Sequence, residues 1–316
     1  MNATFDDVFR GRGYTLPSDY LVGLPTLTFS FLQITVGCVN LWILKNLPIF
    51  HNAFGFFCAL RTLVEILSNS VHLFFSAPMT LLQIRSIHPM FSILAGYLGY
   101  SLSSIACTLH VTLSINRFAC VYFPLRYKTL FCIKNCAICF AAMPLLIFPY
   151  MSLFYVIPCN SLGYSPSYYG YIALGCPRSP DAFSFSDTAN YGCGVFLCFT
   201  AISIDVVTLR KILKLKSYQK HNLGSTEFKR NVRFFVQSAS QNGPMLLDIV
   251  ILTLGANSID DSKAFHRSFS FVLTRFTDFL NAMTLVLFIP EARRFLFKYE
   301  TQHHVQVASV SGISSS

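Results

Sequence analysis

Seven long apolar runs divide this sequence, and they constrain its fold more than any other feature. A helix needs about 20 mostly apolar residues to cross the hydrocarbon core of a bilayer. Strands of a membrane barrel would instead alternate apolar and polar residues over about 10 positions. The runs therefore predict an all-α membrane protein, a seven-transmembrane helix bundle with spans at Leu21–Leu44, Phe54–Leu82, Met90–Ile115, Asn135–Ile157, Tyr191–Leu209, Phe234–Leu254 and Phe269–Ile289.

The composition excludes a soluble domain of this length. Only 12% of the 316 residues are charged and 53% are hydrophobic, with a mean hydropathy of +0.52, whereas soluble domains carry about 25% charged residues. The net charge of +10 lies in short segments between the apolar runs rather than over a surface, so it does not indicate nucleic-acid binding. The expected surroundings of the chain are a lipid bilayer, with no nucleic acid as partner.

The distribution of basic residues predicts the orientation. With the N-terminus outside, 16 of the 24 Lys and Arg residues fall in cytoplasmic segments and six in outer ones, as the positive-inside rule requires. Residues 1–20 then form an extracellular tail, residues 21–289 the seven-helix domain, and residues 290–316 a short amphipathic helix with a cytoplasmic tail. Asn2 begins the sequon Asn2-Ala3-Thr4 on the predicted outer side, which makes it a candidate glycosylation site.

The most specific motif lies at the inner end of the third run. Residues 114–127 read SINRFACVYFPLRY, which resembles the acid–Arg–aromatic motif of rhodopsin-like G-protein-coupled receptors followed by the Pro-Leu-Arg-Tyr of their second inner loop. The Asn before the Arg, the Phe after it and the short inner loop Asn46–Ala53 are similar to nematode chemoreceptors. The stretches at 52–55 and 233–241 resemble serpentine receptor class X most, and the resemblance extends from about Gly23 to Phe297.

This resemblance implies a chemosensory G-protein-coupled receptor rather than an enzyme, without catalytic residues, metal or cofactor. It would transmit the binding of an extracellular small molecule, entering between spans three, five, six and seven, to a heterotrimeric G protein. It would reside in the plasma membrane, including that of a sensory cilium. The residues that match the family's coupling and activation positions are Asn116, Arg117, Phe118, Pro124, Arg126, Tyr127, Pro244 (the span-six hinge) and Asn281.

Arg117 lacks the acidic neighbour that usually holds this arginine, because Asn116 precedes it. Glu227 lies 17 residues before Pro244, which predicts a position near the inner base of span six. A guanidinium at the membrane edge needs a partner. We therefore expect an Arg117–Glu227 restraint on the resting state.

Several charged residues interrupt the apolar spans and are expected to face the bundle rather than lipid. Arg61 with Glu65, and Arg275 with Asp278, are spaced to pair on one helix face. These groups either line a ligand cavity or activation network, or pair helices structurally, and the sequence leaves both open. The candidate cavity or network residues are Glu65, Asn69, Asp248, Arg275 and Asp278; Asp205 shares their environment, and His72 and His110 are expected to be satisfied interior groups rather than metal ligands.

Three cysteines, Cys159, Cys176 and Cys193, lie on the predicted outer side, where disulfides persist. Receptors of the resembling superfamily tie this loop to the top of span three, but Ser92 stands at the matching position. The resemblance therefore implies a bridge within the loop, for which Cys159–Cys176 is the first candidate.

A seven-helix transporter or ligand-gated sensory channel is the alternative. Such a protein would have charged residues along a continuous polar path and often an internal repeat. This sequence contains no evident repeat, and its intramembrane charges are scattered over four spans. The pattern favours the receptor.

Overall fold

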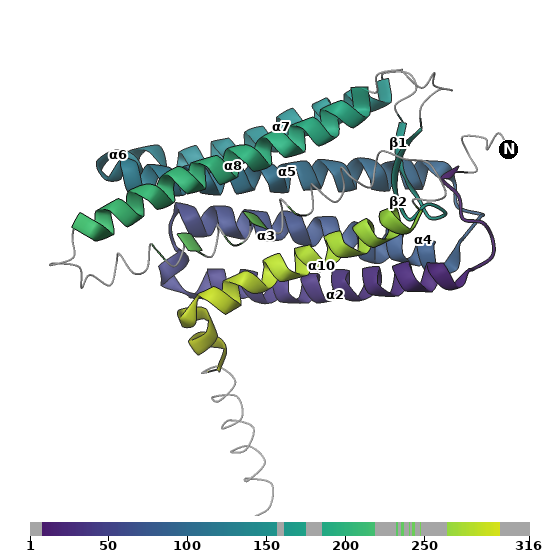
Figure 1. Ribbon diagram of the computed structural model, residues 1–316, viewed down its shortest axis with the longest axis horizontal. Helices are drawn as coiled ribbons and strands as arrows, with labels where there is room; N and C mark the ends of the chain where they lie inside the picture. Colours follow the sequence, from purple (N-terminus) through teal and green to yellow (C-terminus); the bar gives the residue numbers. More distant parts are fainter. Residues whose placement is uncertain are drawn as a thin grey trace, which may run out of the picture.

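The computed structural model is a bundle of long helices that lie side by side (Figure 1). It describes residues 8–156, 161–174, 185–218 and 264–297, with residues 232, 235–236, 240, 242–243 and 247. Within that part, six helices are long and apolar enough to cross a membrane. They correspond to six of the seven predicted spans, and the remaining one, Phe234–Leu254, lies almost entirely outside the described residues. The helices are α2 (Pro17–Asn46), α3 to α4 (Ala53–Leu82), α5 (Pro89–Tyr122), α7 (Ile133–Val156), α8 (Phe185–Tyr218) and α10 (Ala264–Phe288).

The second span is one helix with a widened turn. α3 (Ala53–Val71) passes through the π-helix η2 (His72–Ser76) into α4 (Ala77–Leu82). Pro78 has no N–H to donate to the carbonyl of Phe74 four residues earlier, which explains why the regular ladder breaks here. The span ends at Gln83, whose φ of 46° is left-handed and terminates the helix.

Two short helical elements each begin at a proline. The turn η1 (Pro48–Phe50) joins the first two spans, and α6 (Pro124–Leu130) follows α5. Pro124 occupies the first position of α6, where its missing N–H costs nothing. Residues 290–297 are helical and turn away from the bundle after α10 (Figure 1).

The helices bury polar side chains and expose apolar ones, the inverse of a soluble protein. Arg61, Glu65 and Arg117 are buried, whereas Leu145 and Phe196 have 74% and 69% of their surface exposed. In lipid, apolar side chains can face outward at no cost, while charged groups must face the bundle. The distribution therefore agrees with a membrane environment.

Close packing joins the first span to its neighbours. A Cβ at Gly37 would lie 2.8 Å from Cγ1 of Ile66, so the small residue lets α2 approach α3. Asn40 donates from Nδ2 to the carbonyl oxygen of Ala282 at 2.7 Å, which ties α2 to α10.

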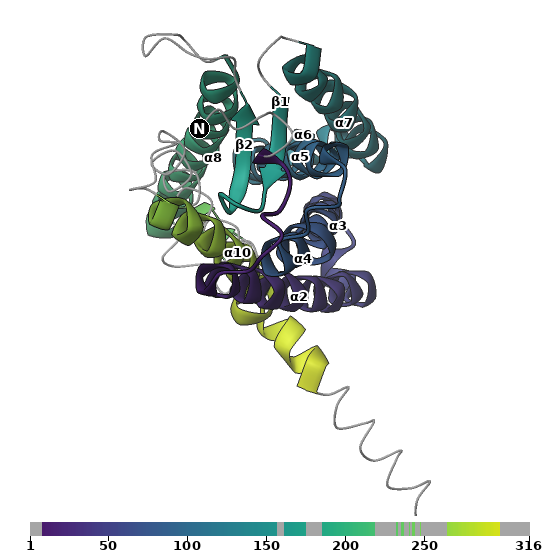
Figure 2. The same ribbon diagram turned by 90° about the vertical axis from the view of Figure 1, so that its right-hand side faces the viewer.

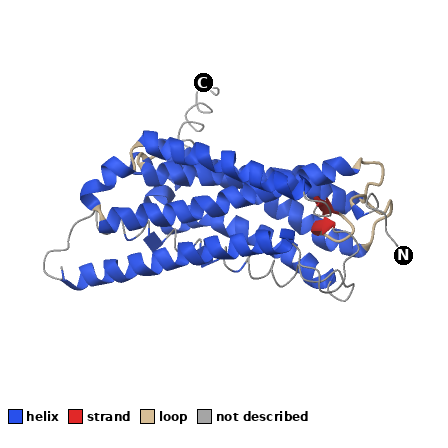
Figure 3. Ribbon diagram, turned by 90° about the horizontal axis from the view of Figure 1, so that it is seen from above, coloured by secondary structure: helices blue, strands red, loops and turns tan. Residues whose placement is uncertain are grey.

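A two-stranded hairpin, which the sequence prediction did not include, covers one end of the bundle. β1 (Ser161–Ser165) pairs antiparallel with β2 (Gly170–Leu174). Figure 2 looks onto this end and shows the hairpin among the helix ends, and Figure 3 places both strands at the same end. Tyr164 is fully buried there and shares a hydrogen bond with Thr80. Burial raises the pKa of Tyr164, so its hydroxyl stays neutral.

Residues 8–16 lie against the hairpin, and we call these two segments, 8–16 and 161–174, the cap. Ser165 donates from its hydroxyl to the carbonyl of Val8 at 2.6 Å, and Ser92 donates to the carbonyl of Phe9 at 2.8 Å. Phe9 is fully buried. Ser92, which replaces the expected cysteine, therefore anchors the cap to α5 by a hydrogen bond.

Asp19 joins the cap to the first two spans. Its carboxylate accepts hydrogen bonds from Nε2 of Gln83 at 2.8 Å and from the hydroxyl of Tyr169 at 2.7 Å, and it forms an ion pair with Arg12. Burial lowers the pKa of Arg12, but hydrogen bonds and charge from Tyr169 and Asp19 outweigh it and raise the pKa overall. A single buried carboxylate thus holds three segments together.

Candidate functional site

A cavity of about 250 Å³ lies inside the bundle, between α3, α5, α7, α8 and α10. Tyr171 of the hairpin contributes to its wall, so the cap borders the cavity. The charged side chains of the lining, Glu65, Arg275 and Asp278, lie on the α3 and α10 walls, where Ser68, Asn69, Thr274 and Asn281 add polar atoms. His72 of η2 and Ser103, Ser104, Thr108 and His110 of α5 are further polar groups of the wall.

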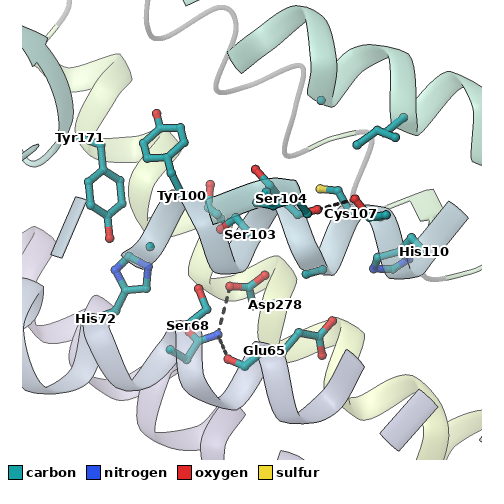
Figure 4. Close-up of a pocket in the computed structure, with 18 of the residues that line it drawn as sticks. Glu65, Ser68, His72, Tyr100, Ser103, Ser104, Cys107, His110, Tyr171 and Asp278 are labelled. Atoms are coloured by element: carbon teal, nitrogen blue, oxygen red, sulfur yellow. Dashed lines mark hydrogen bonds between the residues drawn. The ribbon is translucent and has the colours of Figure 1, made fainter. Parts of the chain in front are cut away.

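Two ion pairs organise these walls. Within α10, Nη1 of Arg275 lies 2.9 Å from Oδ2 of Asp278. Within α3, Nε of Arg61 lies 2.9 Å from Oε1 of Glu65. Asn69 connects the two walls, because its Nδ2 donates to Oδ2 of Asp278 at 3.3 Å and to the carbonyl of Glu65 at 3.1 Å (Figure 4). The arrangement brings together four of the five predicted cavity residues.

An aromatic group forms the end of the cavity beneath the cap. The imidazole of His72 lies 5.8 Å from the ring of Tyr171 and 5.5 Å from that of Phe271, and Tyr100 lies 5.3 Å from Tyr171. Burial raises the pKa of Tyr171, against a lowering effect of Arg275, so the hydroxyl is uncharged. This end offers apolar ring faces to a guest, while the α3 and α10 walls offer polar atoms.

Arg117 lies 21 residues beyond Gly96 of α5, which contacts the hairpin, and so is about 30 Å from the cap. It is buried, lies 2.9 Å from Oδ1 of Asp205 in α8, and donates to the hydroxyl of Ser114 at 2.8 Å. Its guanidinium also lies 5.7 Å from the ring of Phe235. This pair joins α5 to α8.

A chain of hydrogen bonds connects the cavity with Arg117. His110 lines the cavity, and its Nδ1 lies 3.1 Å from Oδ1 of Asn242. Nδ2 of Asn242 donates to Oδ2 of Asp205 at 2.5 Å, and Asp205 pairs with Arg117. The inner end of the cavity and Arg117, about two turns further along α5, are thus linked by side-chain contacts through α8 and Asn242.

Comparison with known protein families decides what kind of bundle this is. The family described as serpentine type 7TM GPCR chemoreceptor Srx matches residues 28–288. The chain belongs to the Srx family of chemoreceptors. No curated protein matches the sequence. The matched range contains the cavity walls and Arg117, so both belong to the part of the chain that Srx receptors share.

Several other residues of this Srx chain that the sequence predicted to take part in coupling lie on α6 or near the end of α5. Asn116 donates from Nδ2 to the hydroxyl of Tyr127 at 3.1 Å, which fastens α6 to α5. Burial raises the pKa of Tyr127, and the bond to Asn116 lowers it, with a net rise. Phe118 stacks on Tyr122 with ring centroids 4.3 Å apart, and Arg126 is exposed. These residues lie close to Arg117 in the sequence.

Other predicted positions lie elsewhere or outside the described residues. Asn281 is buried and lines the cavity. Asn2, Cys159, Cys176, Glu227, Pro244 and Asp248 lie outside the described residues, so the bridge, the Glu227 restraint and the hinge stay predictions. Within the described ranges, Asp205 is the acidic partner of Arg117, and no cluster of three His, Cys, Asp or Glu side chains could hold a metal ion.

The structure adds features that the sequence pattern did not reveal. The cavity extends to span two, whereas the predicted ligand position involved spans three, five, six and seven. His110 has the expected partner, but Nδ1 of His72 has none among the described residues. The sequence pattern did not predict Tyr171 as a cavity residue, because it lies in a loop that has no strong strand signal. Its aromatic density (Tyr164, Tyr168, Tyr169 and Tyr171) was the available clue.

Proposed function

We propose that this Srx receptor binds a small extracellular molecule in the cavity and activates a heterotrimeric G protein at the Arg117 end. The hydrogen-bond chain from His110 through Asn242 and Asp205 to Arg117 is the observation that supports this most. In this proposal the chain crosses the membrane seven times, with Phe234–Leu254 as the sixth span. The N-terminus and the cavity lie toward the outside of the cell. The receptor resides in the plasma membrane, including that of a sensory cilium.

Activation is proposed as a shift between two states of the bundle. A ligand that binds one state better favours it by the difference in binding free energy. In the resting state, the ion pair between Nη2 of Arg117 and Oδ1 of Asp205, 2.9 Å apart, holds α5 to α8. In the active state the pair opens, span six bends at Pro244, and Arg117 with Asn116, Phe118, Pro124, Arg126 and Tyr127 meets the G protein. Glu227 is proposed as a second acceptor for Arg117.

The direct test is a small-molecule screen in cells that express the receptor with a promiscuous G protein. The proposal expects ligand-dependent nucleotide exchange, and Arg117→Ala should abolish the exchange without abolishing binding to purified receptor. Whole-cell current evoked by ligand without a G protein would instead favour the channel alternative.

The restraint has its own test in the absence of any ligand. Asp205→Asn removes the charge opposite Arg117 and should raise basal nucleotide exchange several-fold. Glu291→Gln, which changes an acid in the helix that follows α10, is the matched control and should leave basal exchange unchanged. Equal basal exchange in both variants would contradict the restraint.

A further inference from the structure

Two oxygen atoms on the cavity wall are buried acceptors without a hydrogen-bond partner among the described residues. They are Oε2 of Glu65 and Oδ1 of Asn69, in residues that are 7% and 1% exposed. The residues are four apart on α3, so both project from the same helix face, one turn apart. Both line the cavity. Buried acceptors in proteins are nearly always paired, so this pair marks a place for donors.

The neighbouring donors cannot supply what these oxygens lack. Nδ2 of Asn69 is already directed at the carbonyl of Glu65 and at Asp278, which fixes the amide with its oxygen on the other side. Arg61 is engaged at Oε1 of Glu65. Arg275 is held against Asp278 and over the ring of Phe271, 5.9 Å from its centroid. None of the described side chains donates to either oxygen, so both are available to a guest.

The rest of the cavity sets the size and character of such a guest. A cavity of about 150 Å³ holds benzene, so about 250 Å³ admits roughly ten non-hydrogen atoms by the same scale. Tyr100, Met151, Leu197 and Phe271 provide the apolar part of the lining. Figure 4 shows Glu65 and Asp278 on one side of the space and Tyr100 and Tyr171 toward the other end.

We infer that the cavity selects compact molecules with an amine or alcohol group at one end and an apolar, aromatic-sized body at the other. The N–H or O–H donates to Oε2 of Glu65 and Oδ1 of Asn69, and the body lies among the rings beneath the cap. A molecule of the same size with only acceptors leaves both oxygens unpaired and meets repulsion from them. This inference rests on the proposed role of the cavity as the ligand site.

The experiment measures binding to the purified full chain in lipid nanodiscs, without a G protein. The donor probes are 2-phenylethylamine and 2-phenylethanol, and the acceptor-only probes are acetophenone and 2-methoxyethylbenzene. The donor probes should raise the melting temperature and bind at least tenfold more tightly, because a site built for hydrogen-bond donors rejects analogues that lack them. The amine and the alcohol arms distinguish a cationic from a neutral donor. Equal binding by both series, or by neither, would overturn the inference.

Glu65→Gln reverses the chemistry of one acceptor. The amide oxygen will face the guanidinium of Arg61, and the NH₂ group will face the cavity. Donor probes should then lose tenfold or more in affinity, while the acceptor-only probes gain. Glu291→Gln should show the wild-type preference. If Glu65→Gln does not fold, the wild-type comparison of the two probe series still decides the matter.

The outcomes separate this inference from the proposed function. Binding of donor probes without any nucleotide exchange would leave the cavity chemistry intact and count against coupling to a G protein. Exchange driven by an acceptor-only molecule, with competition showing that it occupies the cavity, would support the receptor and refute the donor preference.

Discussion

At the scale of single residues, Arg117 carries a charge where the bundle excludes water, and Asp205 neutralises it at 2.9 Å. Removing one member of a buried ion pair leaves an uncompensated charge, which costs more than removing both members. The pair can therefore be tested for stability as well as for signalling.

We predict that Asp205→Asn lowers the free energy of unfolding by about 3 kcal/mol. The double variant Arg117→Met with Asp205→Leu should lose much less, because no unpaired charge remains. Denaturation of purified protein in detergent measures both. If the double variant is less stable than Asp205→Asn alone, then Asp205 does not stabilise the protein by neutralising Arg117.

A second prediction concerns Asn40, which is buried and donates to the carbonyl of Ala282 at 2.7 Å. Asn40→Ala should lower the free energy of unfolding by about 1 kcal/mol, the usual size of an interhelical hydrogen bond in a membrane. Thr35→Ala is the control on the same helix, because Thr35 is exposed and bonds only within α2. Equal effects of the two changes would argue against the contact between α2 and α10.

Residue contacts were predictable from the sequence where they are local. The pairs Arg61–Glu65 and Arg275–Asp278 follow from spacings of four and three on a helix. Asp205 and Arg117 are 88 positions apart, and Asn69 and Asp278 are 209 apart. Helical periodicity says nothing about which faces of distant helices meet, so these contacts required the structure.

At the scale of elements, hydrogen bonds to Asp19 hold the cap to the bundle. Arg12, Gln83 and Tyr169 all bind its carboxylate. Because one group serves three segments, its loss should loosen them together rather than one by one.

We predict that Asp19→Asn increases hydrogen exchange about tenfold or more in residues 8–16 and 161–174 at once. Asn keeps the shape of the side chain but loses the charge that attracts Arg12. Ser18→Ala, which removes only the hydrogen bond between Ser18 and Tyr169, should affect the hairpin alone. Exchange measured by mass spectrometry distinguishes the patterns, and a change confined to residues 8–16 would refute Asp19 as the common centre.

The apolar runs located six helices that are long and apolar enough to cross a membrane, because the length of a hydrophobic run can be read directly from the sequence. The helices extend further, since α2 begins at Pro17 and α5 continues to Tyr122. Helix ends outside the hydrocarbon core need no apolar residues, so hydropathy does not mark them. The hairpin was not predicted because burial of Tyr164 and Phe9, rather than a local strand pattern, stabilises it.

At the scale of the whole molecule, the proposed signalling depends on the orientation of the bundle in the membrane. The cavity extends from the cap along α5 to His110, and Arg117 lies about two turns beyond that residue. This arrangement transmits a signal inward only if the cap is outside, which the distribution of Lys and Arg predicts. With the proposed sixth span at Phe234–Leu254, the six described spans make an odd number of crossings, and the proposal therefore predicts that the two termini lie on opposite sides.

Accessibility of epitope tags at the two termini tests this most directly. Antibody staining of intact and permeabilised cells should detect the N-terminal tag in both and the C-terminal tag only after permeabilisation. Detection of both tags on the same side of the membrane, or of the C-terminal tag alone on intact cells, would contradict the account.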